Sequence, residues 1–173
     1  SYICGIKITF YFTQSYLINS RVSAVISKYC TLNRKKYIYI STDHYYTGGK
    51  ERKHSEDCKV NLCNEYATTK YLGERLSLLN KNALIVRTNI VGFRYNKESP
   101  TFIEWALHAI ENNEQITLFN DFYTSSIDVR SFSKSLCDLI EKDEKGIINL
   151  ASSEVSNKYQ FICALAMKLN LSI

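Results

Sequence analysis

The chain has 173 residues, 45% of them hydrophobic, and a formal net charge of +5, which suits one well-cored domain better than two. No apolar run approaches the ~20 residues that span a bilayer and nothing reads as a signal peptide, so we expect a cytoplasmic protein without a membrane partner. The basic residues are dispersed, and their one dense run, Asn33–Lys36, directly precedes an apolar strand. We therefore expect a solvated loop there and no nucleic-acid partner.

The cysteines lie mostly inside apolar segments, which is typical of reduced thiols and not of the disulfide framework of a small secreted domain. They are Cys4, Cys30, Cys58, Cys63, Cys137 and Cys163. Cys58 and Cys63 form the one close pair, and His54 is a nearby third donor. Because zinc needs further ligands at suitable spacing, we expect no metal site.

The first half of the chain reads as helix, strand, loop, helix and strand. Leu17 to Tyr29 predicts a helix with Val22, Val25 and Ile26 facing inward. The clearest strand follows at 37–40, and a second strand lies at 83–86. Between the strands, a polar loop over 48–61 precedes a helix over 64–79 with one buried stripe. This order predicts a parallel sheet.

The second half continues the alternation of helices and short strands. The predicted helices cover 102–110, 132–140 and 159–169, and the predicted strands cover 116–118 and 147–150. We therefore expect an α/β fold with a Rossmann-like parallel sheet and a small α/β substrate-binding region. We place the first over residues 1–92 and the second mainly over 93–173, interleaved with the first.

Candidate catalytic residues gather where the first predicted strand ends, at the edge at which open α/β sheets place their ligands. Tyr66 and Lys70 are four residues apart on a predicted helix, so they share one face. A nearby ammonium stabilises a phenolate and lowers the pKa of a tyrosine from about 10 toward a useful range. Thr42, at the strand end, could offer a hydroxyl to the same substrate oxygen.

The tyrosine and lysine pair is weak evidence by itself, because 13 tyrosines make the spacing common. A second instance, Tyr46 and Lys50, contains Gly48 and Gly49, which disfavour a helix, and we set it aside. The plain alternative for Tyr66 and Lys70 is an amphipathic helix with a boundary tyrosine and a solvated lysine.

The surrounding residues resemble the extended short-chain dehydrogenases, most closely the dTDP-4-dehydrorhamnose reductase family. Four stretches carry the resemblance in the family's order: 39–43 (YISTD), 64–74 (NEYATTKYLGE), 86–92 (VRTNIVG) and 146–161 (GIINL with SNKYQF). The resemblance covers most of the chain from about Leu17 onward. Within it, Asn19 is similar to the family's structural asparagine.

The resemblance implies hydride transfer between NADPH or NADH and a carbon of a nucleotide-linked sugar. In the reductive direction Tyr66 would protonate the carbonyl oxygen, Thr42 would hydrogen-bond the developing alkoxide, and Lys70 would hold the nicotinamide ribose. Tyr66 and Lys70 are thus also cofactor-binding candidates. The substrate-binding candidates are Asp43, His44, Asn89 and Ile90. His44 could instead be a surface histidine, and Asn89 a turn residue that satisfies its own backbone.

The main departure from the family is the absence of a Gly-rich phosphate loop. Gly5 is the one glycine before Gly48, and we retain it as a cofactor-binding candidate. We expect that the first part of the cofactor-binding fold is missing, that the chain alone binds the dinucleotide weakly, and that it associates through the incomplete sheet edge, for instance as a homodimer. Thr47 and Ser126 also differ from the family's usual residues, which bears on substrate choice.

Three functions remain open at this point. The first is reduction of a nucleotide-linked 4-keto-6-deoxysugar, as in rhamnose biosynthesis. The second is an epimerase or dehydratase of the same superfamily. The third is a non-catalytic regulatory or binding protein on this scaffold, similar to the regulatory subunit of methionine adenosyltransferase. The joint presence of Thr42, Tyr66 and Lys70 favours an enzyme.

Overall fold

The structure is a computed structural model that describes residues 13–46 and 52–171. Gly5, Thr47, Gly48, Gly49 and Lys50 lie outside the described residues. The chain forms two compact units. The first comprises 1–47, 54–88 and 138–150, and the second comprises 48–53, 89–137 and 151–173. The division into a partial Rossmann-like domain over 1–92, which carries the catalytic residues, and a mainly substrate-binding region over 93–173 stays a prediction.

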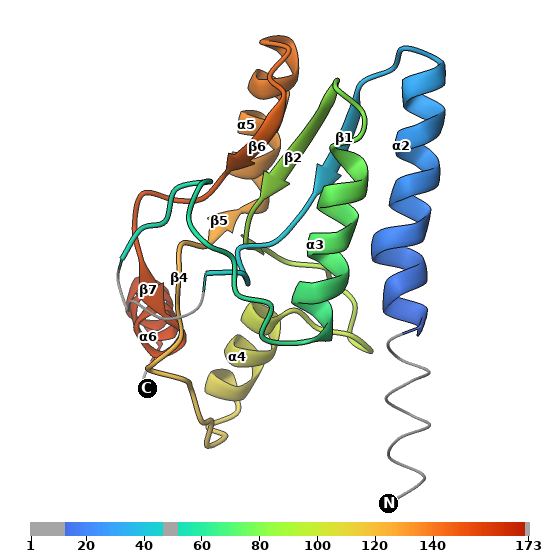
Figure 1. Cartoon of the computed structure of the whole chain (residues 1–173). Coiled ribbons are helices and arrows are strands. Elements are labelled where there is room, and N and C mark those ends of the chain that lie inside the picture. The colour runs from blue at the N-terminus through green and yellow to red at the C-terminus, as the bar shows by residue number, and fades with distance from the viewer. Residues whose placement is uncertain (1–12, 47–51, 172–173) are drawn as a thin grey trace, which may run out of the picture. The chain divides into compact units, whose positions relative to one another are not determined.

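The first unit is built on a parallel three-stranded sheet in the order β1 (Tyr37–Ile40), β2 (Ala83–Arg87), β6 (Gly146–Asn149) (Figure 1). Ile40 pairs with Val86, which in turn pairs with Ile148. The expected Rossmann-like parallel sheet is therefore confirmed. β2 is the central strand of this sheet and is buried along its whole length, which explains its run of apolar residues.

Two helical segments pack side by side in this unit (Figure 1). A π-helical segment, η1 (Leu17–Val22), continues into α2 (Ser23–Leu32), and α3 (Glu65–Ser77) connects β1 to β2. Parallel strands need such a crossover, and α3 packs against both of them. The expected helices over 17–29 and 64–79 are thus confirmed.

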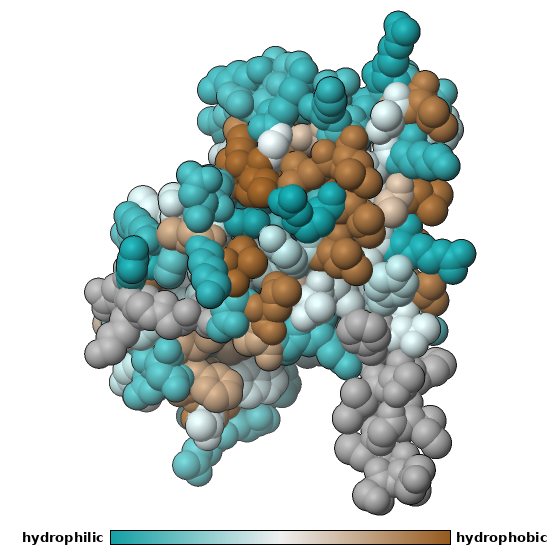
Figure 2. All heavy atoms as spheres, in the orientation of Figure 1, coloured by the Kyte–Doolittle hydropathy of each residue, from teal (hydrophilic) through white to brown (hydrophobic). Residues whose placement is uncertain are grey.

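The expected orientation of the first helix is wrong. Val22, Val25 and Ile26 are 48%, 63% and 43% exposed, whereas serines 20, 23 and 27 are buried. The hydroxyl of Ser20 donates to the carbonyl of Thr69 (2.7 Å), and that of Ser27 donates to the carbonyl of Ser77 (3.1 Å). Small side chains whose hydroxyls find partners on the neighbouring helix let the two backbones come close. The apolar stripe of η1 and α2 consequently faces outward, where apolar and polar spheres alternate along the helix (Figure 2).

The second unit contains α4 (Phe102–Glu111), α6 (Lys158–Lys168) and two small strand pairs. β3 (Ile90–Val91) runs parallel to β5 (Ile127–Asp128), and β4 (Tyr123–Thr124) pairs antiparallel with β7 (Ser156–Asn157). α5 (Val129–Glu141) starts in this unit and ends in the first. The helices α4, α5 and α6 match the expected positions, and so does the strand β6 of the first unit.

The expected strand over 116–118 is wrong, because this segment has no regular structure. Ile116 and Leu118 instead help to line a cavity of about 440 Å³ beside α6 residues Tyr159 and Ile162. The alternation of apolar side chains at Ile116 and Leu118 is typical of a strand. The strand pairing of this unit is instead made by β4 and β7, where Tyr123 pairs with Asn157.

Candidate functional site

Thr42 lies just past the carboxyl end of β1, where the chain turns. The backbone N–H of Ser41 still donates to the carbonyl of Val86 (2.7 Å), and that of Asp43 donates to the carbonyl of Thr88 (3.2 Å). These bonds tie the segment after β1 to the end of β2. The hydroxyl oxygen of Thr42 accepts the backbone N–H of His44 (3.1 Å). A hydroxyl that accepts one bond keeps its own proton to donate, which is the role expected of Thr42 toward a substrate oxygen.

Tyr66 is in the first turn of α3 and is 49% exposed, so its phenol is not sealed in an apolar core. The helix begins at Asn64, whose extended backbone and side-chain oxygen cap it through the N–H of Ala67 (2.8 Å). The ring of His44 meets the ring of Tyr66 edge to face, with centroids 6.1 Å apart. The turn after β1 and the start of α3 are therefore in contact at the proposed proton donor.

Lys70 lies one turn further along α3 and is directed at the end of β1. Its Nζ donates to the carbonyl of Ile40 (2.6 Å) and lies 4.3 Å from the centroid of the Tyr39 ring. Burial lowers the pKa of the Lys70 ammonium, and the negative charge of Glu74 opposes that shift. The structure thus brings Thr42, Tyr66 and Lys70 to one end of one strand, although in different surroundings.

A nicotinamide dinucleotide fits the chemistry of this strand end. Lys70 supplies a cation and Tyr66 an accessible hydroxyl, both of which suit a ribose. Thr88, at the end of β2, has a buried hydroxyl with no hydrogen-bond partner among the residues the structure describes. Such a group is costly to leave unsatisfied, so a polar group arriving at this edge would be favoured.

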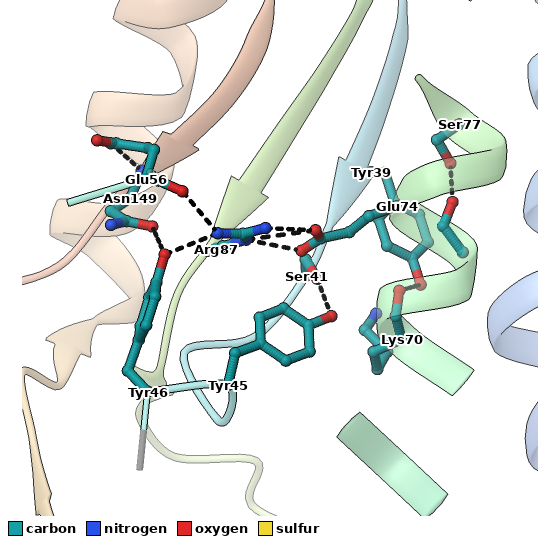
Figure 3. Close-up of polar contacts among 11 residues, drawn as sticks. Tyr39, Ser41, Tyr45, Tyr46, Glu56, Lys70, Glu74, Ser77, Arg87 and Asn149 are labelled. Atoms are coloured by element: carbon teal, nitrogen blue, oxygen red, sulfur yellow. Dashed lines mark hydrogen bonds and ion pairs between the residues drawn. The ribbon is translucent and has the colours of Figure 1, made fainter. Parts of the chain in front are cut away.

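A buried ion pair connects β2 to α3 (Figure 3). Arg87 of β2 donates to both carboxylate oxygens of Glu74 of α3, with Nε 3.0 Å from Oε1 and Nη2 2.8 Å from Oε2. Both side chains are almost completely buried. Burial alone would lower the pKa of Arg87, but the hydrogen bonds and charge of Glu74 outweigh it and raise that pKa.

The same guanidinium anchors the loops that flank the site (Figure 3). Its Nη1 donates to the hydroxyl of Tyr46 (2.7 Å) and to the carbonyl of Glu56 (3.3 Å). Tyr46 donates in turn to the side chain of Asn149 (3.1 Å), whose backbone N–H donates to the Glu56 carboxylate (2.7 Å). The ring of Tyr46 also stacks on His54. One buried charge on β2 therefore binds Tyr46 and Glu56, and both of these residues also bind Asn149 of β6.

Sequence reasoning missed this network. Its signal was a charged residue in an otherwise apolar strand, ALIVR, because a buried arginine requires a partner. The expected structural asparagine is present: Asn19 donates to Thr69 (3.1 Å), and its carbonyl accepts the hydroxyl of Tyr39 (3.0 Å), which connects η1, α3 and β1.

Asn89 and Ile90 belong to the second unit. The side chain of Asn89 donates to the hydroxyl of Thr124 (2.7 Å), and its carbonyl accepts the N–H of Ile127 (2.9 Å). Asn89 therefore braces the short strands of its own unit. Ile90 is 39% exposed on β3. Substrate contact by these two residues stays a prediction, as it does for Asp43.

Other kinds of site find no support in the described part of the chain. Within residues 13–46 and 52–171 no group of three or more His, Cys, Asp or Glu side chains could hold a metal ion. The cysteines described there, Cys30, Cys58, Cys63, Cys137 and Cys163, are free thiols. In the same ranges no helix has the length and apolar character needed to cross a membrane.

Residues 12–172 match the family model of the RmlD substrate binding domain. The chain belongs to this family. Among curated protein sequences none matches it. The resemblance drawn from the four sequence stretches is thus confirmed at the level of the family.

Solved structures share the fold. A dTDP-4-dehydrorhamnose reductase from Clostridium acetobutylicum superposes with a TM-score of 0.86 at 18% identity over 96% of this chain and 59% of its own. The Bacillus anthracis reductase, in complex with NADP, gives 0.85 at 22% identity over 94% and 57%. A UDP-N-acetylglucosamine 4-epimerase from Methanobrevibacter ruminantium, in complex with UDP-N-acetylmuramic acid, gives 0.74 at 22% identity over 88% and 53%. The chain therefore spans less than two thirds of the length of these proteins.

Proposed function

We propose that the protein takes part in nicotinamide-dependent reduction of a nucleotide-linked 4-keto-6-deoxysugar, with Tyr66 as the general acid. The observation that carries the proposal is the convergence of Thr42, Tyr66 and Lys70 at the carboxyl end of β1, with the phenol of Tyr66 accessible. The family match and the reductases of the same fold support it.

Each residue has a role that follows from its surroundings. The bound dinucleotide, NADPH or NADH, would supply the hydride. The hydroxyl of Thr42 donates a hydrogen bond to the sugar carbonyl oxygen and so orients the sugar. Tyr66 donates a proton to the same oxygen as negative charge develops there. Lys70, fixed by the Ile40 carbonyl, holds a positive charge beside the ribose and the tyrosine.

Replacing Tyr66 by Phe tests the assignment. We expect kcat for oxidation of NADPH or NADH with a dTDP-4-keto-6-deoxysugar to fall by about 10²-fold or more, because the proton donor is lost. The matched control is Tyr71→Phe on the same helix, whose ring packs edge to face against Tyr45. Equal rates for Tyr66→Phe and the wild type would refute the role of Tyr66.

Epimerisation of a nucleotide sugar is the second candidate, favoured by the structural match to the 4-epimerase. An epimerase returns its hydride to the substrate, so it consumes no net reduced cofactor. Incubation with a nucleotide sugar and catalytic amounts of NAD, followed by analysis of the sugar products, separates the two reactions. Binding of the nucleotide sugar without turnover in either assay would instead point to the non-catalytic alternative.

A further inference from the structure

The hydrogen bond between Asn64 and His44 has a defined direction. Oδ1 of Asn64 accepts the backbone N–H of Ala67 (2.8 Å), and a backbone N–H can only donate. This contact fixes the orientation of the amide, so its NH₂ group is the end that lies 3.0 Å from Nε2 of His44. An NH₂ group donates and does not accept. Nε2 of His44 must therefore be an unprotonated acceptor, and the neutral ring carries its proton on Nδ1.

His44 contacts both residues whose hydroxyls are proposed to serve the substrate oxygen, Thr42 and Tyr66. Its backbone N–H donates to the hydroxyl oxygen of Thr42, and its ring packs edge to face against Tyr66. Its Nε2 is bonded to the residue that caps α3, two positions before Tyr66. One residue thus connects the turn after β1 to the first turn of α3. Substrate contact by His44 stays a prediction, and these contacts indicate a structural role as well.

We propose that His44 is a positioning residue: its neutral ring, protonated on Nδ1, fixes the first turn of α3 to the segment after β1 and so sets the place of Tyr66 relative to Thr42. The catalytic consequence rests on the proposed function, whereas the direction of the hydrogen bond does not. Two hydroxyls that serve one oxygen must keep a fixed separation, and a displacement of about 1 Å in such a site can cost about 10²-fold in rate.

Two substitutions at Asn64 separate this bond from the helix cap. Asn64→Asp keeps a capping oxygen for Ala67, but its second oxygen can only accept, so Nε2 of His44 must then carry a proton. Asn64→Ser also keeps a capping oxygen, and its short side chain does not extend to His44. Asn112→Asp is the matched control, because Asn112 has the same kind of contact with the exposed His108.

The proton position is read by ¹⁵N NMR of the histidine rings at a pH where they are neutral. The chain has three histidines, and His44→Phe identifies the signals of His44. We expect an unprotonated Nε2 in the wild type and in Asn112→Asp, a protonated Nε2 in Asn64→Asp, and a mixture of tautomers in Asn64→Ser. A protonated Nε2 in the wild type, or no change in Asn64→Asp, would overturn the proposal.

Enzyme kinetics and the NMR signals of the Tyr66 ring test the positioning role. We expect Asn64→Ser, which loses the bond to His44, to lower kcat by about tenfold while KM stays near the wild-type value, since binding contacts remain. Asn64→Asp keeps this bond in the reversed direction, so it should lower kcat less. The ring signals of Tyr66, assigned with Tyr66→Phe, should shift in Asn64→Ser and should not shift in Asn112→Asp. Unchanged Tyr66 signals and unchanged kcat would reject positioning even with the predicted tautomer. Shifted Tyr66 signals in a protein without hydride transfer would uphold positioning and reject the proposed function.

Discussion

The ion pair between Glu74 and Arg87 allows a quantitative test of what holds the site together. Replacing Glu74 by Gln removes the negative charge and leaves the guanidinium buried, with an amide NH₂ group among its own donors. Breaking one partner of a buried pair typically costs about 3–5 kcal/mol. In a chain of 173 residues each kcal/mol lowers Tm by about 2–4 °C, so we expect a fall of about 10 °C.

Urea denaturation followed by circular dichroism measures the change in the free energy of unfolding. The double variant Glu74→Leu with Arg87→Met removes both charges. Its loss of unfolding free energy should therefore be smaller, by about 2 kcal/mol, than the sum of the losses of the single variants Glu74→Leu and Arg87→Met. Asp143→Asn is the control, because it removes a carboxylate from an exposed bridge to Lys36 and should cost much less. A Glu74→Gln variant as stable as the control, or additive single and double losses, would refute this reasoning.

Two further predictions concern packing and pH. A Cβ at Gly73 would overlap the carbonyl oxygen of Asn19 and the hydroxyl of Tyr39, so Gly73→Ala should lower the free energy of unfolding by about 1–3 kcal/mol, even though alanine favours helices; a rise in Tm would contradict the close packing. Glu104 accepts the backbone N–H groups of Thr101, Tyr95 and Arg94, which lower its pKa below 4.5. The contribution of the Glu104 carboxylate to stability is complete above its unfolded-state pKa of 4.5 and is lost as the pH falls through the lower folded-state pKa. The Tm difference between the wild type and Glu104→Gln should therefore shrink in acid. A constant Tm difference from pH 6 to 3 would show that the carboxylate charge is irrelevant.

The sheet and most of its helices could be predicted because their signals are local. A run of β-branched and apolar residues, as in β2, and an apolar stripe on a helix, as in α4, follow directly from burial. The helix starts also have local signals. Thr101 with Glu104, and Asn157 with Gln160, form capping boxes at the starts of α4 and α6.

The orientation of η1 and α2 could not be predicted in this way, because periodicity says that a helix has an apolar face but not which neighbour that face meets. Ile18, Val22, Val25, Tyr29 and Leu32 follow a 4-3-4-3 spacing and are all exposed. The face toward α3 is selected by close approach, through Ser20, Ser27 and Gly73, and by hydroxyls that satisfy carbonyls across the interface. Such an interface has little hydrophobic signal, so a rule that places apolar residues inside assigns the faces in reverse.

Prediction of the candidate site from the sequence has the same limit. The spacing of Tyr66 and Lys70 and the position of Thr42 at a strand end were visible in the sequence, since each follows from one helix or one strand. The connection among them was not, because it passes through contacts between segments: Lys70 to the carbonyl of Ile40, and Asn64 to the ring of His44. A motif of reactive residues can be read from sequence, but the protonation state and placement that make them act together depend on the groups around them. The tautomer of His44 is the sharpest instance, since it is dictated by a single helix-capping bond twenty residues further along the chain.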